Sequence, residues 1–151
     1  MTEQMQPPSG VIEGSRHLYP VRVFFEDTDL SGIAYHANYL KWCERARSDI
    51  LRVLGIDQRA AFEAGEGFYA VSEANIKWRR PAKFDDVLTV ETRCTQVRAA
   101  SAHMIQRIFR AEELLAEIEI TAAFLSADGR PKRQPDAWRA AFATFTQKDP
   151  E

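Results

Sequence analysis

The apolar residues of this chain recur with a helical period over one long stretch and with a period of two over most of the later residues. Between residues 38 and 54 they recur at steps of three and four, at Tyr39, Cys43, Ala46, Ile50 and Leu54. This spacing predicts an amphipathic helix of about four turns, with Asn38 as its N-cap and Gly55 as its stop. After Gly67 the period changes to two, which is typical of strands with one buried face. One long helix followed by a series of strands favours an α+β fold, in which an antiparallel sheet packs one face on the helix.

The alternating stretches predict a sheet of about five strands. Residues 18–25 are rich in Val, Phe and Tyr and end at an acidic turn, so they form the first predicted strand. Four more strands are expected at residues 72–78, 88–95, 103–110 and 116–124. Short helices are expected at residues 58–64 and 136–144.

The length of 151 residues, 45% of them hydrophobic and 28% charged, is that of one soluble globular domain. We expect this domain to span residues 16–147, after a mobile tail over residues 1–15 that contains acids and prolines but no apolar run. The formal net charge of -2 gives no long-range attraction to nucleic acid or to an anionic membrane, so no nucleic-acid partner is expected.

The two cysteines, Cys43 and Cys94, have no paired Cys or His spacing, so neither a disulfide framework nor a zinc site is predicted. A reducing, cytoplasmic location fits this cysteine usage best. The N-terminal segment lacks the apolar run of a secretory signal, and no stretch of about 18 apolar residues could span a bilayer. We therefore expect no integral membrane segment and no bound metal.

One loop, between the first predicted strand and the long helix, concentrates reactive groups. The carboxylates of Asp27 and Asp29 and the imidazole of His36 all lie close in sequence to the expected start of the helix. Backbone N–H groups in the first turn of a helix have no partner within the helix and carry the positive end of its dipole, so they can hold a developing oxyanion. A carboxylate beside them can act as a base or as a nucleophile in acyl transfer.

Two other interpretations of this loop stay open on the residues alone. Asp, Ser and Gly between a strand and a helix are ordinary turn and cap residues. The spacing of Asp27, Asp29, Ser31 and Gly32 also matches the first half of an EF-hand calcium loop. That match fails where the loop needs a bidentate Glu, because Asn38 occupies the position, and the preceding segment is predicted as a strand instead of a helix.

The string YPVRVFFEDTDLSGIAYHANYLKWCERAR, at residues 19–47, resembles the signature of the 4-hydroxybenzoyl-CoA thioesterase family of hotdog-fold proteins. Its elements EDTD, G-x-x-YH-x-x-Y and ERAR are most similar to those of the acyl-CoA thioesterases associated with the Tol-Pal system. The segment RPAKFDDVLTVET, at residues 80–92, is similar to a strand-turn-strand segment of the same family. The resemblance covers residues 18–145, which is nearly everything except the N-terminal tail.

This resemblance implies a hotdog fold, in which a curved antiparallel sheet wraps one long central helix and subunits pair into homodimers or homotetramers. The family hydrolyses acyl-CoA thioesters without a metal or prosthetic group, so no cofactor is expected. Its catalytic aspartate corresponds to Asp29, and the histidine of its YH pair corresponds to His36. Ala34 and Phe25 depart mildly from the family pattern, which bears on the shape of the pocket more than on its chemistry.

The resemblance also suggests roles for the residues around the catalytic pair. Asp29 is expected either to attack the thioester carbonyl, giving a mixed anhydride, or to activate a water for direct attack. His36 and the backbone N–H groups near Tyr35 to Ala37 are expected to hold the oxyanion, while Asp27 and Gly32 position the loop.

Four residues on the predicted helix have both a functional and a structural interpretation. Tyr39 and Trp42 are candidates for the acyl pocket, although aromatic residues at helical spacing are more often core residues. Cys43 could suggest a thiol nucleophile, but it falls on the apolar stripe and is expected to be a small core residue. Glu44 is expected to belong to a surface ion-pair face.

Cations are needed to bind the phosphates of coenzyme A. Lys77, Arg79 and Arg80 are the expected ligands, and a second basic patch is formed by Arg98, Lys132 and Arg133. Each of these residues fits a solvated strand edge equally well, where Lys and Arg discourage aggregation.

The leading hypothesis is therefore a thioesterase that acts on a short-chain, medium-chain or aromatic acyl-CoA. The alternative is a hotdog module that binds acyl-CoA or acyl carrier protein without turnover. Asp29 favours the enzyme, because a pure binding module needs no carboxylate at the start of the helix. A single copy of such a fold would expose an edge strand and half of a ligand groove, which predicts self-association.

Overall fold

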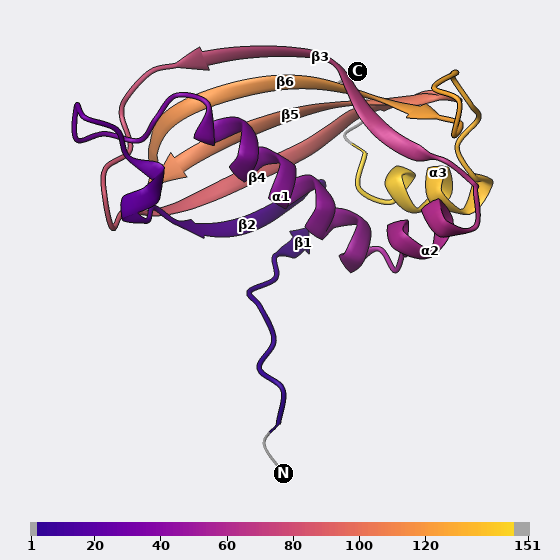
Figure 1. The fold of residues 1–151 in the computed structure, drawn as a ribbon, viewed down its shortest axis with the longest axis horizontal. Coiled ribbons are helices and arrows are strands. Elements are labelled where there is room, and N and C mark those ends of the chain that lie inside the picture. Colours follow the sequence, from indigo (N-terminus) through magenta and orange to yellow (C-terminus); the bar gives the residue numbers. More distant parts are fainter. Residues whose placement is uncertain (1–2, 147–151) are drawn as a thin grey trace.

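Six strands form a single sheet in the order β1-β2-β4-β5-β6-β3, and every neighbouring pair is antiparallel (Figure 1). The computed structural model describes residues 3–146. The strands are β1 (Val11–Glu13), β2 (Arg16–Arg22), β3 (Phe68–Trp78), β4 (Val87–Val97), β5 (Ser101–Arg110) and β6 (Glu113–Leu125). The predicted α+β fold is confirmed, with six strands instead of about five because the short β1 adds a strand at one edge.

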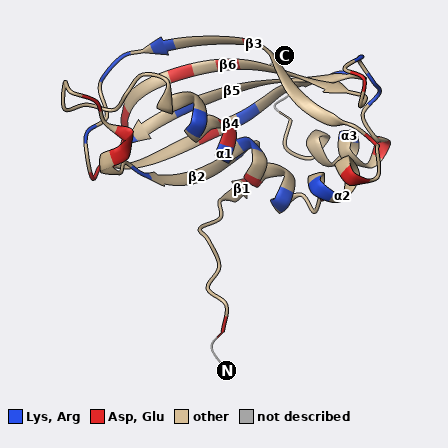
Figure 2. Ribbon diagram, in the orientation of Figure 1, with Lys and Arg blue, Asp and Glu red and all other residues tan. Residues whose placement is uncertain are grey.

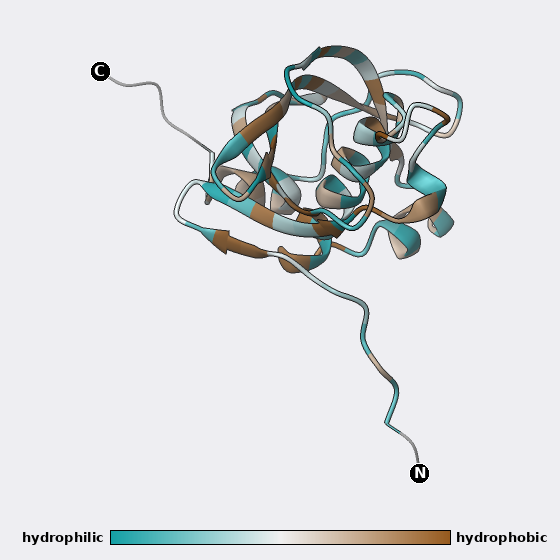
Figure 3. Cartoon of the chain, turned by 90° about the vertical axis from the view of Figure 1, so that its left-hand side faces the viewer, coloured by the Kyte–Doolittle hydropathy of each residue, from teal (hydrophilic) through white to brown (hydrophobic). Residues whose placement is uncertain are grey.

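The helix α1 (Asn38–Val53) lies along the sheet and is amphipathic, as its apolar spacing predicts. Charged residues occur along the length of α1 (Figure 2). Its apolar residues are buried: Tyr39, Cys43, Ala46 and Ile50 are at most 2% exposed. An end-on view shows the sheet curving around the helix (Figure 3). The helix therefore fills the concave side of the sheet, which is the arrangement expected of a hotdog fold.

The start of α1 differs from the prediction in one respect. Its N-cap is Ala37, and no side chain caps the first turn. Asn38 is instead the first helical residue, and its side-chain amide donates to the backbone oxygen of Asp27 at 2.7 Å. The predicted cap at Asn38 is therefore wrong, because that side chain holds the preceding loop and not the helix amides.

Alternation predicts the long strands well. In β4 and β6 the inward-facing residues Leu88, Val90, Ile118 and Ile120 are buried, as their period of two requires. The first predicted strand, residues 18–25, is displaced toward the N-terminus: β2 ends at Arg22, and Phe25 already begins the 3-10 turn η1 (Phe25–Asp27).

Two short helices complete the fold, α2 (Gln58–Glu63) and α3 (Asp136–Ala143). Phe142 of α3 packs with Leu51, Met104 and Phe145 in a second core cluster. In Figure 1 both helices lie at one end of the molecule, and the loop between β2 and α1 lies at the other.

Part of the predicted N-terminal tail is structured. Residues 11–13 form β1 and pair with β2, while Ser9 and Gly10 are hydrogen-bonded to the side chain of Asp49 on α1. Ordered contacts therefore begin at residue 9, before the expected domain start at residue 16. Residues 1–2 of the expected tail, and residue 147 at the end of the expected domain, lie outside the described residues.

Cys43 and Cys94 are both free and buried. Over the described part of the chain, none of the helices combines the length and the apolar character needed to cross a membrane.

Candidate active site

The loop between β2 and α1 is held in a tight turn around Asp29. The backbone N–H of Asp29 donates to Ile33 O at 3.0 Å, and the N–H of Gly32 donates to Asp29 O at 3.0 Å. Gly32 has a φ of +82°, in the left-handed region that favours glycine over residues with a Cβ. The shape of the turn therefore favours a glycine at position 32.

The carboxylate of Asp29 is exposed and accepts two hydrogen bonds from Ser31. One comes from the Ser31 hydroxyl and one from its backbone N–H at 2.8 Å. These bonds hold the pKa of Asp29 below its ordinary value, and the charge of His36 contributes in the same direction. At neutral pH this side chain is an ionised carboxylate in contact with solvent.

Asp27 organises the loop between the strand and the helix. Its carboxylate accepts from the backbone N–H of Phe24 at 2.8 Å. Its backbone oxygen accepts from the N–H of Tyr35 at 2.8 Å and from the side chain of Asn38. These contacts tie the end of β2 to the start of α1.

His36 lies between two aromatic side chains. Its ring centroid is 4.4 Å from that of Tyr35 and 5.8 Å from that of Trp78, whose indole N–H donates to the backbone oxygen of His36 at 3.3 Å. We call the depression beside this ring the His36 hollow. It is lined by Ile33, Ala34, His36, Tyr39, Trp78, Arg79, Arg80 and Pro81.

The backbone N–H groups near the start of α1 are not equally available to donate a hydrogen bond to a ligand. The N–H of Tyr35 already donates to Asp27, so it is not available to an oxyanion. Within residues 3–146, no backbone acceptor binds the N–H groups of His36 and Ala37. The candidate oxyanion donors are therefore the amides of these two residues.

The helix residues predicted for the acyl pocket are deeply placed. Trp42 is 1% exposed and packs edge-on against Tyr39 in the main core cluster. Tyr39 borders the His36 hollow, but its hydroxyl accepts from the backbone N–H of Ala82 at 3.0 Å. Cys43 is buried next to them, and burial raises the pKa of its thiol to about 12, so it stays protonated at neutral pH.

The predicted CoA-binding cations divide into two groups. Arg79 and Arg80 border the His36 hollow, and Arg80 is 3.8 Å from Glu113. Lys77 is exposed on β3 but does not line the hollow. Figure 2 shows basic residues at the end of β3, at the same end of the molecule as acidic residues of the loop between β2 and α1.

The second predicted basic patch lies away from the His36 hollow. Lys132 donates to the backbone oxygen of Glu66, and Arg133 is paired with Asp136 at the start of α3. Arg98 is exposed at the end of β4, and its backbone oxygen accepts from Gln134. These cations border the end of the molecule that holds α3.

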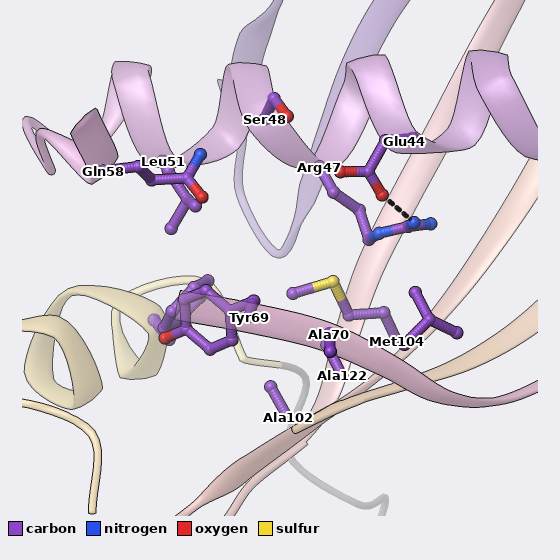
Figure 4. A pocket seen from close by; sticks show the side chains of 12 residues that line it. Glu44, Arg47, Ser48, Leu51, Gln58, Tyr69, Ala70, Ala102, Met104 and Ala122 are labelled. Atoms are coloured by element: carbon purple, nitrogen blue, oxygen red, sulfur yellow. Dashed lines mark hydrogen bonds and ion pairs between the residues drawn. The ribbon is translucent and has the colours of Figure 1, made fainter. Parts of the chain in front are cut away.

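A second concave site, which the sequence pattern does not predict, lies between α1 and the sheet (Figure 4). This helix–sheet cavity has a volume of about 70 Å³ and is partly open to solvent. Small residues provide the space, because Ala102 and Ala122 are cross-strand partners and Val71 pairs with Ala122 on the other side. Alanines at inward-facing positions of neighbouring strands were the available signal, but only the strand register brings them together.

The helix–sheet cavity is mostly apolar, with polar side chains on its helix side. Leu51, Met104 and Phe142 contribute apolar surface, and Glu44 and Arg47 of α1 line the same space. Over residues 3–146, no group of three or more His, Cys, Asp or Glu side chains is placed to hold a metal ion.

Comparison with known proteins identifies the family. Residues 23–143 match the model of the thioesterase-like superfamily. The chain is 36% identical over 125 residues to the acyl-CoA thioesterase YbgC of Haemophilus influenzae, covering 82% of this chain and 92% of that protein. It is 40% identical over 103 residues to the acyl-CoA thioester hydrolase YbgC of Escherichia coli O6:H1, covering 68% of this chain and 76% of that protein.

Solved structures agree on the architecture. A probable thioesterase from Bartonella henselae superposes with a TM-score of 0.75 at 35% identity, over 80% of this chain and 99% of that one. A 1,4-dihydroxy-2-naphthoyl-CoA thioesterase from Synechocystis shares the fold, with a TM-score of 0.79 at 24% identity, over 85% of this chain and 96% of that one. The resemblance to hotdog-fold thioesterases is thus confirmed by sequence and by fold, and the chain belongs to the thioesterase-like superfamily.

Proposed function

We propose that the protein hydrolyses acyl-CoA thioesters to a free acid and coenzyme A, with Asp29 as the catalytic carboxylate. The observation that carries the proposal is the ionised, solvent-exposed Asp29, in a turn beside His36 and the uncapped start of α1. Relatives at 36% and 40% identity are named acyl-CoA thioesterase and acyl-CoA thioester hydrolase, which supports the same reaction for this chain.

In the proposed reaction the thioester carbonyl lies beside His36, within reach of the amides of His36 and Ala37. Charge that develops on the carbonyl oxygen is stabilised by these donors and by the positive end of the α1 dipole. Asp29 acts in its ionised form, either as the nucleophile or as the base for a water. Incorporation of ¹⁸O into Asp29 during turnover in labelled water would establish the nucleophilic route, because an anhydride opened at the aspartyl carbonyl transfers label to the protein and direct attack by water does not.

Arg79 and Arg80 are the proposed partners of the coenzyme A phosphates. Both border the His36 hollow, so a nucleotide held there would direct its thioester arm toward His36. No broad basic field is required, since a few local cations suffice for a ligand bound in one orientation.

The acyl group needs an apolar site, and the helix–sheet cavity is the proposed one. A short or medium acyl group cannot reach from the His36 hollow into the helix–sheet cavity of the same chain, because the two sites border different parts of β3. Val71 borders the cavity and Trp78 borders the hollow. At the usual rise of a strand these two residues are about 23 Å apart.

A second copy of the chain can bring a helix–sheet cavity close to the His36 hollow. β3 is an edge strand whose far side is unpaired within residues 3–146, and most of its residues are exposed. Antiparallel pairing of β3 with its own copy, centred near Glu73, places Phe68 of one chain opposite Trp78 of the other. The cavity of each chain then lies beside the His36 hollow of its partner, and the proposed active unit is a homodimer or a dimer of such dimers.

Replacement of Asp29 tests the proposed reaction. Release of the CoA thiol is measured over a panel of short-chain, medium-chain and aromatic acyl-CoAs for the wild type and for Asp29→Asn. We expect kcat to fall by roughly 1,000-fold or more without a change in melting temperature, because the side chain is exposed. Asp128→Asn, which removes an exposed carboxylate from the turn after β6, is the matched control.

Near wild-type kcat in Asp29→Asn would exclude this residue as the catalytic carboxylate. A wild-type protein that binds coenzyme A tightly but releases no thiol from any substrate would instead be a binding module for acyl-CoA or acyl carrier protein.

A further inference from the structure

The helix–sheet cavity contains a charged side chain that a plain hydrocarbon pocket does not need. Most of its lining is apolar, including Leu51, Met104 and Phe142. Arg47 nevertheless extends from α1 toward the sheet and lines the cavity, with a side chain only 11% exposed (Figure 4). A cation removed from water at an apolar wall is costly unless acceptors surround it.

Two acceptors fix the position of the Arg47 guanidinium. Its Nη1 donates to the side-chain oxygen of Gln106 at 2.7 Å, and its Nη2 donates to Glu44. Gln106 is fully buried, and its own amide donates at 3.0 Å both to the backbone oxygen of Cys43 and to the hydroxyl of Thr92. Arg47 is thus held by a buried amide that is itself bonded to the core, so its orientation is preorganised.

The Arg47 guanidinium still has N–H groups that are not hydrogen-bonded. An arginine side chain carries five N–H groups, and the bonds to Gln106 and Glu44 engage one hydrogen on each terminal nitrogen. Among the residues that the structure describes, no other acceptor binds Arg47. An oxygen on a molecule inside the cavity can therefore accept a charge-assisted hydrogen bond from a preorganised donor.

We propose that Arg47 is a specificity-determining residue, which selects acyl groups that carry a hydroxyl over hydrocarbon acyl groups of the same length. This inference rests on the proposed function, in that the cavity receives the acyl group. A hydrocarbon would remove water from Arg47 and return no hydrogen bond, whereas a hydroxyl accepts from Arg47 and can donate to the neighbouring Glu44.

The test uses pairs of acyl-CoAs that differ by a single hydroxyl: hexanoyl with 6-hydroxyhexanoyl, and benzoyl with 4-hydroxybenzoyl. We expect the wild type to favour the hydroxylated member of at least one pair by about 10- to 100-fold in kcat/KM, the size of one charge-assisted hydrogen bond. Arg47→Met keeps the length of the side chain but removes its donors, and should bring that ratio close to one. Arg47→Lys, which keeps the charge, should retain part of the preference and covers the case in which Arg47→Met does not fold.

Arg45→Met is the matched control, because Arg45 is an exposed arginine of the same helix that does not line the cavity. Its selectivity should equal that of the wild type. An equal loss for both members of each pair in the Arg47 variants would show a purely structural role and overturn the proposal. Equal kcat/KM for both members in the wild type would overturn it as well.

A binding measurement separates this inference from the proposed function. In the Asp29→Asn background, titration calorimetry gives Kd for each acyl-CoA without hydrolysis. Tighter binding of the hydroxylated member, lost on adding Arg47→Met, supports the role of Arg47 even if the wild type shows no turnover. Equal Kd values for both members overturn it, whatever the result of the turnover assay.

Discussion

Asp29 and Cys43 are two potential nucleophiles near the start of the same helix, and their surroundings move their pKa values in opposite directions. Hydrogen bonds from Ser31 lower the pKa of the exposed Asp29, whereas burial raises the pKa of Cys43 to about 12. At neutral pH the carboxylate is charged and accessible, and the thiol is neutral and enclosed. The surroundings of these two residues therefore favour carboxylate chemistry over a thiol mechanism.

His36→Ala is expected to cause a partial loss of activity. The amides at the start of α1 remain in this variant, so only the contribution of the imidazole to the carbonyl is removed. We expect kcat/KM to fall by about 10- to 100-fold, less than in Asp29→Asn, as for the loss of one hydrogen bond to a charged group. The comparison is measured by thiol release, with His103→Ala as the control because His103 lies on β5 and its ring contacts Thr95. An unchanged kcat/KM in His36→Ala would assign His36 to the packing of Tyr35 and Trp78 alone.

The lowered pKa values of His17 and Asp49 predict that the folded protein loses stability in acid. His17 is fully buried with its Nε2 2.7 Å from Asp49, and its Nδ1 has no partner among the described residues. Burial lowers the pKa of His17 from 6.5, and hydrogen bonds from Ser9, His17 and Gly10 outweigh burial to lower the pKa of Asp49 from 3.8. In both cases the unfolded chain takes up a proton before the folded one does, so stability is lost as the pH falls below 6.5 and further below 3.8.

The melting temperature of the wild type should accordingly fall between pH 7 and pH 5. His17→Gln cannot titrate, so its melting temperature should depend less on pH over that interval, although it starts lower at pH 7. Identical pH dependence in the two proteins would show that His17 does not govern this transition.

At the scale of elements, the sequence predicts the helices and strands whose position is set by a local pattern of apolar residues. The apolar stripe of α1 and the alternation in β4 and β6 are set by burial on one face, and these elements appear where expected. The strand β1 has three residues, too few to show alternation; it pairs with β2, and Gly10 just before it donates to Asp49 far along the chain. A Cβ at Gly10 would lie 2.2 Å from the backbone oxygen of Leu18, a constraint that only the folded chain reveals.

The candidate site divides in the same way. Asp27, Asp29 and His36 lie on one loop, so a local motif is enough to bring them to one place. The helix–sheet cavity joins residues of α1, α2, three strands and α3, and no local pattern places them together. Arg47 illustrates the difference, because its sequence position on a charged helix face suggests an exposed ion pair, whereas its contact with Gln106 depends on the sheet.

At the scale of the whole molecule, the edge of the sheet at β3 has no neighbouring strand within residues 3–146. Seven of the eleven residues of β3 are exposed, among them Val71 at 46% and Trp78 at 48% exposure. Such an edge is a template for pairing with another chain. Light scattering at micromolar concentration should therefore give at least the mass of a dimer, and a monomer mass would contradict the shared site.

Mixing two inactive variants tests whether Asp29 of one chain works with the cavity of the other. Asp29→Asn removes the carboxylate, and Ala122→Leu fills the cavity while leaving Asp29 intact. If the site is shared, a mixed dimer contains one site with both defects and one with neither. Random exchange makes about half of the dimers mixed, so the mixture should recover about a quarter of wild-type activity. If each chain used its own cavity, every site would keep one defect and mixing would recover nothing. Melting curves of the separate variants, which should each resemble the wild type within a few degrees, establish that recovery comes from shared sites and not from refolding.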